Sequence, residues 1–118
     1  MFDSIVLRTP IRIQRERKKR KPGELEATTE WIDIGNASST DAPRYKWCRW
    51  VGMHGSEAIQ NGLVVGRQTA TVTIRFDAAV GLSHRVLKDG EIWEIVSIDD
   101  VRQIHQWMEL KVARKEAG

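Results

Sequence analysis

The residues of this sequence that could support catalysis or metal binding are one cysteine, three histidines and a pair of adjacent aspartates. The histidines, His54, His84 and His105, are far apart, and none has the spacing to Cys48 or to carboxylates that metal ligands show. Cys48 lies in a stretch of strand character, which favours a buried structural thiol over a nucleophile. The pair Asp99-Asp100 is typical of an ordinary turn. The glycines fit no phosphate-binding loop. We therefore expect a protein that is not an enzyme and that holds no metal or cofactor.

The strongest electrostatic feature is the block RERKKRK, in which six of seven residues are basic. Such a block lies at the surface, because desolvating adjacent like charges costs more than their burial returns. Lysine and arginine neutralise phosphates whatever the base sequence, and they also pair with carboxylates. Three interpretations remain open: a solvated loop that serves only solubility, a contact with DNA, and a contact with an acidic protein surface. The candidate contact residues are Arg15, Arg17, Lys18, Lys19, Arg20 and Lys21.

Five tryptophans in 118 residues form the second unusual feature. Tryptophan supplies a large amphipathic surface, which suits either a barrel core or an interface. Four of them fall in stretches of strand character and are expected in the core or at a seam, namely Trp31, Trp47, Trp93 and Trp107. We take Trp50 as the candidate exposed anchor.

The elements that position these residues are arranged around Ser83–Ile98, SHRVLKDGEIWEIVSI. An Asp-Gly pair between apolar runs is the strongest short-range signal of a β-hairpin. The tight turn requires positive φ angles, which Gly90 tolerates freely and Asp89 tolerates better than most residues. The second strand, Ile92–Ile98, is apolar on both faces. We therefore expect it to be buried on both faces, inside a closed or two-layered sheet.

Five further stretches have the composition or alternation of strands. They are Ile11–Arg15, Thr28–Ile34, Tyr45–Val51, Gln68–Phe76 and Gln106–Ala113. The first two are expected to form a hairpin with a basic loop over residues 15–23. A short helix is expected over Gly55–Gly62, where Ser56 can cap the start and the final glycine can end it. Residues 114–118 should form a flexible tail.

Gln68–Phe76 has the clearest alternation of apolar and polar side chains. Its inward residues are expected to be Ala70, Val72, Ile74 and Phe76. Its threonine face is good strand surface but not core, so that face should meet water or a neighbouring subunit. Together with Trp50 and the short helix, this face supplies the candidate interface residues. They are Trp50, Ser56, Glu57, Thr69, Thr71 and Thr73.

These elements predict a single, mainly all-β domain over residues 1–118. Its architecture should be a small antiparallel β-barrel or sandwich of six to seven strands, with one short helix and long loops. A hydrophobic fraction of 41% supports a real core. No apolar run approaches the ~20 residues of a membrane span, and the first residues lack the pattern of a signal peptide, so no membrane partner is expected. One cysteine cannot form an internal disulfide, which suits a reducing compartment.

Taken in order, the segments resemble those of the head–tail joining proteins of tailed phages, also called head-closure, stopper or connector proteins. The matching elements are LRTPIRIQR, TEWIDI, KWCRW followed by GSEA, TVTIRF, SHRVLKDGEIWEIVSI and WMELKVAR. They extend from about Leu7 to Arg114, and their order is more specific than any single motif. The first hairpin loop of such proteins is commonly acidic and glycine-containing, whereas here it is RERKKRK.

The resemblance implies a small β-barrel that assembles into a ring in the neck of a phage or of a phage-derived particle such as a gene transfer agent. The expected ring is a hexamer, with a dodecamer as the alternative. Its expected partners are further copies of itself, the adaptor or portal ring above, the tail terminator or tail tube below, and packaged DNA in the channel. The protein would be made in the host bacterial cytoplasm and end in the virion.

Two rival functions are compatible with the residues. One is a stand-alone nucleic-acid-binding barrel of the OB or SH3-like kind, with RERKKRK and exposed aromatics as its binding surface. Most of the aromatic rings alternate into strands, which counts against a stacking platform. The other is a tail-terminator or tail-completion ring, which differs only in the ring that the protein joins.

Overall fold

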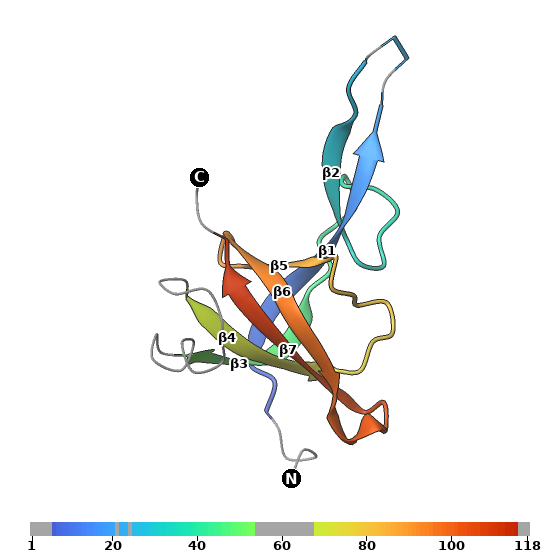
Figure 1. The fold of residues 1–118 in the computed structure, drawn as a ribbon. Helices are drawn as coiled ribbons and strands as arrows, with labels where there is room; N and C mark the ends of the chain where they lie inside the picture. The colour runs from blue at the N-terminus through green and yellow to red at the C-terminus, as the bar shows by residue number, and fades with distance from the viewer. Residues whose placement is uncertain (1–5, 21, 24, 54–67, 116–118) are drawn as a thin grey trace.

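The computed structural model describes residues 6–20, 22, 23, 25–53 and 68–115, and within these residues the fold is almost entirely β (Figure 1). The strands are β1 (Thr9–Lys19), β2 (Thr28–Asp33), β3 (Lys46–Met53), β4 (Thr69–Arg75), β5 (Arg85–Lys88), β6 (Glu91–Asp100) and β7 (Trp107–Arg114). A single 3₁₀ turn in the described part of the chain, η2 (Val101–Gln103), connects β6 to β7. The predicted fold class, an antiparallel β-barrel of six to seven strands, is confirmed.

Six of the seven strands close the barrel, and the remaining strand, β2, lies outside it. The strand order is β2-β1-β3-β4-β7-β6-β5, and a further pairing of β5 with β1 closes the ring of strands. β1 uses its first half for the barrel, where it pairs antiparallel with β3 and β5. Its second half pairs only with β2, and this two-stranded ribbon projects from the barrel (Figure 1). The molecule is therefore elongated, with extents of 54 × 31 × 25 Å.

The core fills the barrel with side chains from alternating positions on every barrel strand. Its fully buried members include Ile11, Ile13, Cys48, Ala70, Val72, Ile74, Val86, Leu110 and Val112. The predicted inward residues of β4 are therefore confirmed, with Phe76 packed at the edge of the core. Strands covered on one face by a core and on the other by solvent require this period of two.

The central hairpin is confirmed, but the expectation that its second strand is buried on both faces is wrong. Asp89 has φ 51° and Gly90 has φ 79°, as the tight turn requires. In β6 the pairing with β7 shifts between Ile95 and Ser97, so that Val96 is an extra residue and stands 43% exposed. This β-bulge changes which alternate residues face inward. Ile95 before the bulge and Ile98 after it can therefore both pack on the core from one face of the strand.

The basic stretch differs from the expected loop over 15–23, because β1 continues as a strand to Lys19. Residues 15–19 are paired with β2 in a register that places Arg17 opposite Glu30 and Lys19 opposite Thr28. A two-stranded ribbon exposes both of its faces to water. Adjacent cations can therefore alternate across it without being buried together.

The expectation that the threonine face of β4 meets water or a neighbouring subunit is wrong for two of its three threonines. Thr69 and Thr73 are buried, and Thr71 is half-buried. β4 lies between β3 and β7, and Thr73 is flanked in register by Arg49 and Glu109. Longer neighbours on both sides cover a short threonine side chain.

Several predicted features lie outside the described residues. They are the short helix over Gly55–Gly62 with Ser56 and Glu57, together with His54, Lys21 and the last three positions of the tail. Within the tail, Arg114 is the last residue of β7.

Candidate functional site

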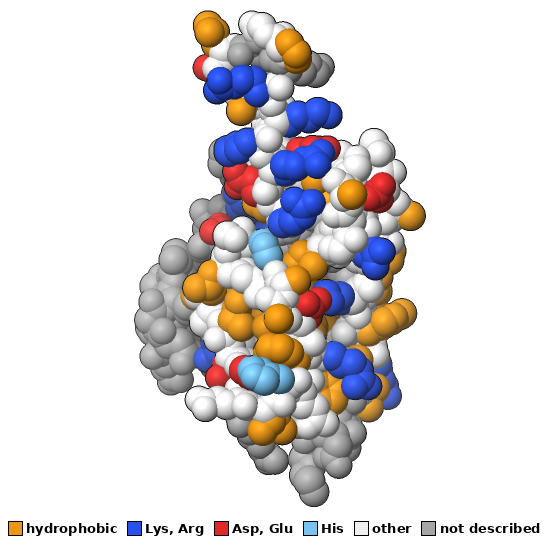
Figure 2. Space-filling view, turned by 90° about the vertical axis from the view of Figure 1, so that its right-hand side faces the viewer, with side chains coloured by type: hydrophobic (Ala, Val, Ile, Leu, Met, Phe, Trp, Pro, Cys, Tyr) orange, Lys and Arg blue, Asp and Glu red, His pale blue; other side chains and the backbone are white. Residues whose placement is uncertain are grey.

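The ribbon formed by β1 from Arg15 onward, by β2 and by the residues between them is called the basic arm. Figure 2 shows Lys and Arg side chains gathered along it. Lys18, Lys19 and Arg20 are exposed, whereas Arg15 and Arg17 are half-buried. The predicted contact residues thus lie together on the arm, except Lys21, which the structure does not describe. Lys18 is exposed but also pairs with Glu16 at 3.0 Å and donates to the Thr29 hydroxyl at 3.0 Å.

Arg15 and Arg17 attach the loop after β2 to the arm. One guanidinium nitrogen of Arg17 donates to the Ala37 carbonyl at 3.0 Å, and Arg17 also pairs with Glu30 at 2.7 Å. Arg15 donates to the Asn36 carbonyl at 3.3 Å. A hydrogen bond from the Ser39 hydroxyl and the contact with Arg17 lower the pKa of Glu30. Arg15 and Arg17 therefore already stabilise the arm and the loop that follows it.

A buried carboxylate joins the arm to the barrel. Asp33, which is 3% exposed, accepts hydrogen bonds from Arg12 Nε at 2.8 Å, from Gln14 Nε2 at 2.9 Å and from the Arg44 backbone N–H at 2.9 Å. Burial raises the pKa of Asp33, but these hydrogen bonds outweigh it and hold the pKa below its usual value. Hydrogen bonding to Asp33 likewise raises the pKa of Arg12. The carboxylate is therefore charged and fully engaged.

The barrel contributes a second contact to this junction through Arg85 of β5. Its Nε donates to Gln14 Oε1 at 3.0 Å, and its guanidinium lies over the Trp31 ring. Desolvation by burial lowers the pKa of Arg85. Trp31 is thus half-buried at the seam between arm and barrel, as its predicted place at a core or seam requires.

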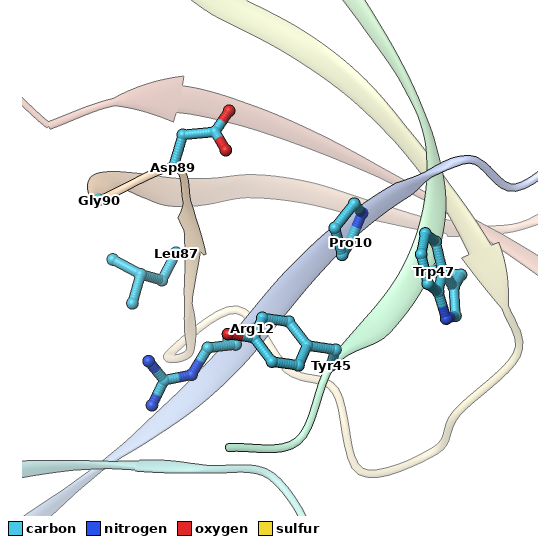
Figure 3. Close-up of a pocket in the computed structure, with 7 residues that line it drawn as sticks. All are labelled: Pro10, Arg12, Tyr45, Trp47, Leu87, Asp89 and Gly90. Atoms are coloured by element: carbon cyan, nitrogen blue, oxygen red, sulfur yellow. The ribbon is translucent and has the colours of Figure 1, made fainter.

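An apolar depression of about 760 Å³, here called the aromatic hollow, lies on the outside of the barrel (Figure 3). It is formed where β3, β1 and β5 lie side by side, with Trp47 opposite Pro10 and Leu87 opposite Arg12. It is lined by Pro10, Arg12, Tyr45, Trp47, Leu87, Asp89 and Gly90. Tyr45 and Trp47 are 61% and 57% exposed, and neighbouring exposed apolar groups of this kind mark interaction sites more often than isolated ones do.

The two tryptophans of β3 therefore have the opposite roles to those predicted. Trp50 is half-buried against the core, edge-on to Trp93 with ring centroids 4.8 Å apart, and Lys88 Nζ lies 4.9 Å from its centroid. Trp47 points outward. Cys48 is the signal that sequence reasoning could have used, since free cysteine is among the most buried residue types and shares its face with Trp50. Trp93 lies in the core, and Trp107 is buried outside the core cluster, so both fit the predicted place in the core or at a seam.

The remaining chemistry-bearing residues form no reactive group in the described part of the chain. Cys48 is fully buried, and desolvation raises the pKa of its thiol to about 12. Among the described residues no three His, Cys, Asp or Glu side chains are grouped as metal ligands are. His105 lies against Phe76 and pairs with Asp100 at 2.6 Å. Nor does any helix in the described ranges have the length and apolarity to cross a membrane.

Comparison with solved structures finds the same fold in two proteins of low sequence identity. The solution structure of protein SF1141 from Shigella flexneri 2a matches with a TM-score of 0.67 and 22% identity, over 94% of each chain. A chain in the virion of a native gene transfer agent particle matches with a TM-score of 0.62 and 13% identity, over 96% of this chain and 97% of that one. A sequence search of curated proteins found no match.

Structures of such low sequence identity show only the fold, whereas a family model identifies the family. Residues 3–116 match the model of the phage head completion protein. The resemblance to head-closure proteins inferred from the ordered segments is thereby confirmed. This chain belongs to the phage head completion protein family, whose members are structural proteins of the virion.

Proposed function

We propose that this protein forms a ring at the head–tail junction of a phage or phage-like particle, where it closes the DNA-filled head and docks the tail. The match to the head completion family over residues 3–116 is the observation that carries this proposal. The ring lies between the portal or adaptor above and the tail terminator or tail tube below. We favour six copies, because a tail tube is usually sixfold.

The outer surface suits a protein that builds contacts. The closed barrel carries the basic arm, which projects from it, and the aromatic hollow, which lies on its outer surface. Its exposed cations, Lys18, Lys19 and Arg20, provide an electrostatic contact with DNA in the channel or with an acidic surface on an adjacent ring.

The isolated chain should be a monomer or a weak oligomer that closes into a ring on its adaptor. A preformed ring holds subunits at high effective concentration, so weak subunit contacts suffice there. Sedimentation of the purified protein at micromolar concentration tests this. A stable ring in the absence of any partner would contradict the dependence on the adaptor.

Imaging of assembled particles tests the position of the ring. The expected result is density for this chain between the portal or adaptor and the tail, and particles without the chain should lose DNA and remain tailless. Tailed, DNA-retaining particles without this chain would refute the proposal. Density at the end of the tail tube would instead assign the tail-terminator function.

Replacing Lys19 and Arg20 with glutamine tests the electrostatic contact without touching the internal contacts of Arg15 and Arg17. Docking or DNA retention should weaken, and the wild type should show the same weakening as salt rises. If DNA is the partner, the slope of log affinity against log salt should become shallower by about 0.9 for each phosphate that the variant no longer neutralises. Loss of ring docking without measurable affinity for free DNA would identify an acidic protein partner.

A stand-alone nucleic-acid-binding barrel is the second candidate, and the exposed cations of the arm favour it. Tyr45 and Trp47 are exposed on the barrel and could stack on bases, whereas Trp93 and Trp107 are buried and Trp50 packs on the core. Tight binding of the purified chain to free DNA, together with normal particles in its absence, would select this function.

A further inference from the structure

We propose that the aromatic hollow receives the tip of the basic arm of a second copy of this chain, with Leu25 of one copy packed against Tyr45 and Trp47 of the next. The proposal rests on the ring function proposed above and names the contact that joins its subunits. Two exposed apolar features on the same molecule motivate it, one convex and one concave.

The convex feature is the tip of the arm. Leu25 is 93% exposed, and Pro22 near it is also exposed. Burying such side chains against another apolar surface is favourable roughly in proportion to the area removed from water. The tip has no core of its own, because β1 and β2 form a two-stranded ribbon there.

The concave feature is the aromatic hollow, whose apolar side chains come from three strands or their ends. Its volume of about 760 Å³ lies in the range of pockets that enclose a sizeable ligand, so it has room for several side chains of a turn. Tyr45 and Trp47 are exposed in the hollow, and its other apolar side chains are Pro10 and Leu87 (Figure 3). A leucine side chain at this place would pack against the apolar lining of the hollow.

The cations at the end of β1 are complementary to a carboxylate at the rim of the hollow, whereas Glu26, beside Leu25, has the same sign as that carboxylate. Arg20 and Lys19 are exposed at the end of β1. Asp89, at the rim of the hollow, has a 79% exposed side chain that pairs with Lys88 at 3.0 Å. A carboxylate can accept several hydrogen bonds, so it can also take a guanidinium. Arg12 in the hollow is already paired with Asp33, which limits its repulsion of an incoming cation.

The arm cannot fill the hollow of its own barrel. Arg12 lines the hollow, and the strand runs on from there as extended backbone to Lys19, a length of about 23 Å. Its pairing with β2 and the buried contacts of Asp33 hold the ribbon straight out from the barrel. An arm that enters this hollow must therefore belong to another copy of the chain.

A contact between two different patches of the same molecule is heterologous. Repetition of such a contact gives a closed ring when the rotation closes, and an open filament otherwise. The same arrangement places each arm across the boundary between two subunits. Lys18, on the side of the arm rather than at its tip, then lies at that boundary, where its side chain pairs with Glu16 but is 65% exposed toward DNA or an adjacent ring.

Cysteine crosslinking in purified particles tests the contact. The double variant Leu25→Cys with Tyr45→Cys is treated with a short bismaleimide and run on a denaturing gel. Cys48 gives little background, because it is fully buried and burial raises its pKa. We expect a ladder of covalent multimers ending at the number of copies in the ring. The matched control is Leu82→Cys with Tyr45→Cys, since Leu82 is 61% exposed but lies on the barrel and not on the arm, and it should give no ladder.

The outcomes distinguish this proposal from the ring function. Particles that contain the double variant but yield only monomer bands would overturn the arm contact and leave the ring function standing. Crosslinking of Leu25→Cys to a different, larger protein would overturn it too, since the tip would then dock on another ring.

If the wild-type chain is absent from particles, the ring function fails. The same reaction on concentrated purified protein then decides the arm contact, with a ladder in support and monomer bands against.

A second measurement keeps the proposal testable where the cysteine variants fail to enter particles. Leu25→Ser and Trp47→Ser should each lower incorporation into particles by at least tenfold, while Leu82→Ser should not. Combining the first two should give no further reduction, because both remove the same contact. Unchanged incorporation of Leu25→Ser would overturn the proposal.

Discussion

The guanidinium carbon of Arg85 lies 4.1 Å from the centroid of the Trp31 ring. Arg85 belongs to the barrel strand β5 and Trp31 to the arm strand β2, so this cation–π contact crosses the junction between them. The same guanidinium donates to Gln14, which in turn donates to Asp33. The direction of the arm is therefore fixed by a connected set of buried polar groups at its base. The proposed contact of the arm with a neighbouring copy requires such a fixed direction.

Asp33→Asn tests this junction. The change keeps the shape of the side chain but removes the charge that Arg12 needs, and it should lower the free energy of unfolding by about 2 kcal/mol at pH 7. The folded state holds the pKa of Asp33 below its usual value. Its stabilisation is therefore present above the unfolded pKa of about 3.9 and is lost as the pH falls through the lower folded value. Urea unfolding should show the gap between wild type and variant closing below about pH 4.

The control for this experiment is Asp89→Asn. Asp89 is largely exposed and asparagine also tolerates its positive φ, so the change should stay within about 0.5 kcal/mol of wild type. A gap between wild type and Asp33→Asn that stays constant down to about pH 3, below the unfolded pKa, would contradict the role given to the carboxylate.

Gly90→Val should lower the free energy of unfolding by about 1–2 kcal/mol or more. No heavy atom lies within 4 Å of the place where a Cβ would stand, so the destabilisation comes from the backbone and not from a clash. With φ at 79°, a β-branched residue is strained in this turn. Gly81→Ala is the control, because its φ is not in the left-handed region and its new Cβ would make an ordinary contact with His84. Equal urea midpoints for the two variants would argue against the turn as the source of the destabilisation.

Cys48 should not react with a soluble thiol reagent in the folded protein at about pH 8. Burial raises its pKa to about 12, so the thiolate that such reagents need is absent, and the side chain has no exposed surface. In denaturant one thiol per chain should react at once. Measurable labelling of the native protein, at a rate independent of urea below the transition, would show that the barrel opens locally at β3.

The sequence predicted the elements of this fold better than it predicted their outward faces. In β4 only one face is apolar, so the alternation itself identified the interior side, and Ala70, Val72 and Ile74 are buried as expected. In β3 both faces carry aromatic rings. Alternation then tells which residues share a face but not which face turns inward. This ambiguity explains why the sequence predicted Trp50 to be exposed and Trp47 to be in the core or at a seam, whereas the structure shows the reverse.

The strand β6 shows a second limit. Its two-sided apolar pattern was interpreted as burial on both faces, whereas a bulge at Val96 lets residues of both parities reach one core. An extra residue in one strand is defined only against its partner, here β7. The pairing between the two strands exists only in the folded sheet, so a local pattern cannot place the bulge.

Part of the candidate site could be predicted from the sequence. The cations of the arm were identified from their run in the sequence, but their division into internal and exposed groups depends on the register between β1 and β2. Glu30 pairs with Arg17 because the hairpin places them opposite each other. The aromatic hollow was missed, since it is assembled from three strands that are neighbours only in the closed barrel.

The internal and the exposed cations of the arm should differ in their effect on stability. Arg17→Gln removes the ion pair with Glu30 and the hydrogen bond to the Ala37 carbonyl, so it should lower the free energy of unfolding by up to about 1 kcal/mol. The pair is partly exposed and therefore screened by solvent, which keeps the effect small. Lys19→Gln with Arg20→Gln should stay within about 0.5 kcal/mol.

Hydrogen exchange locates the effect of Arg17→Gln. Backbone amides of β2 and of the loop over residues 35–43 should exchange faster in this variant, because the loop is then less firmly attached to the arm, while amides of β4 and β7 should not change. Glu30→Gln should reproduce the pattern, and combining both changes should add less than the sum of the two. Equal protection of the loop in Arg17→Gln and in the Lys19, Arg20 variant would show that the ion pair does not hold it, and the basic block would then act only at the surface.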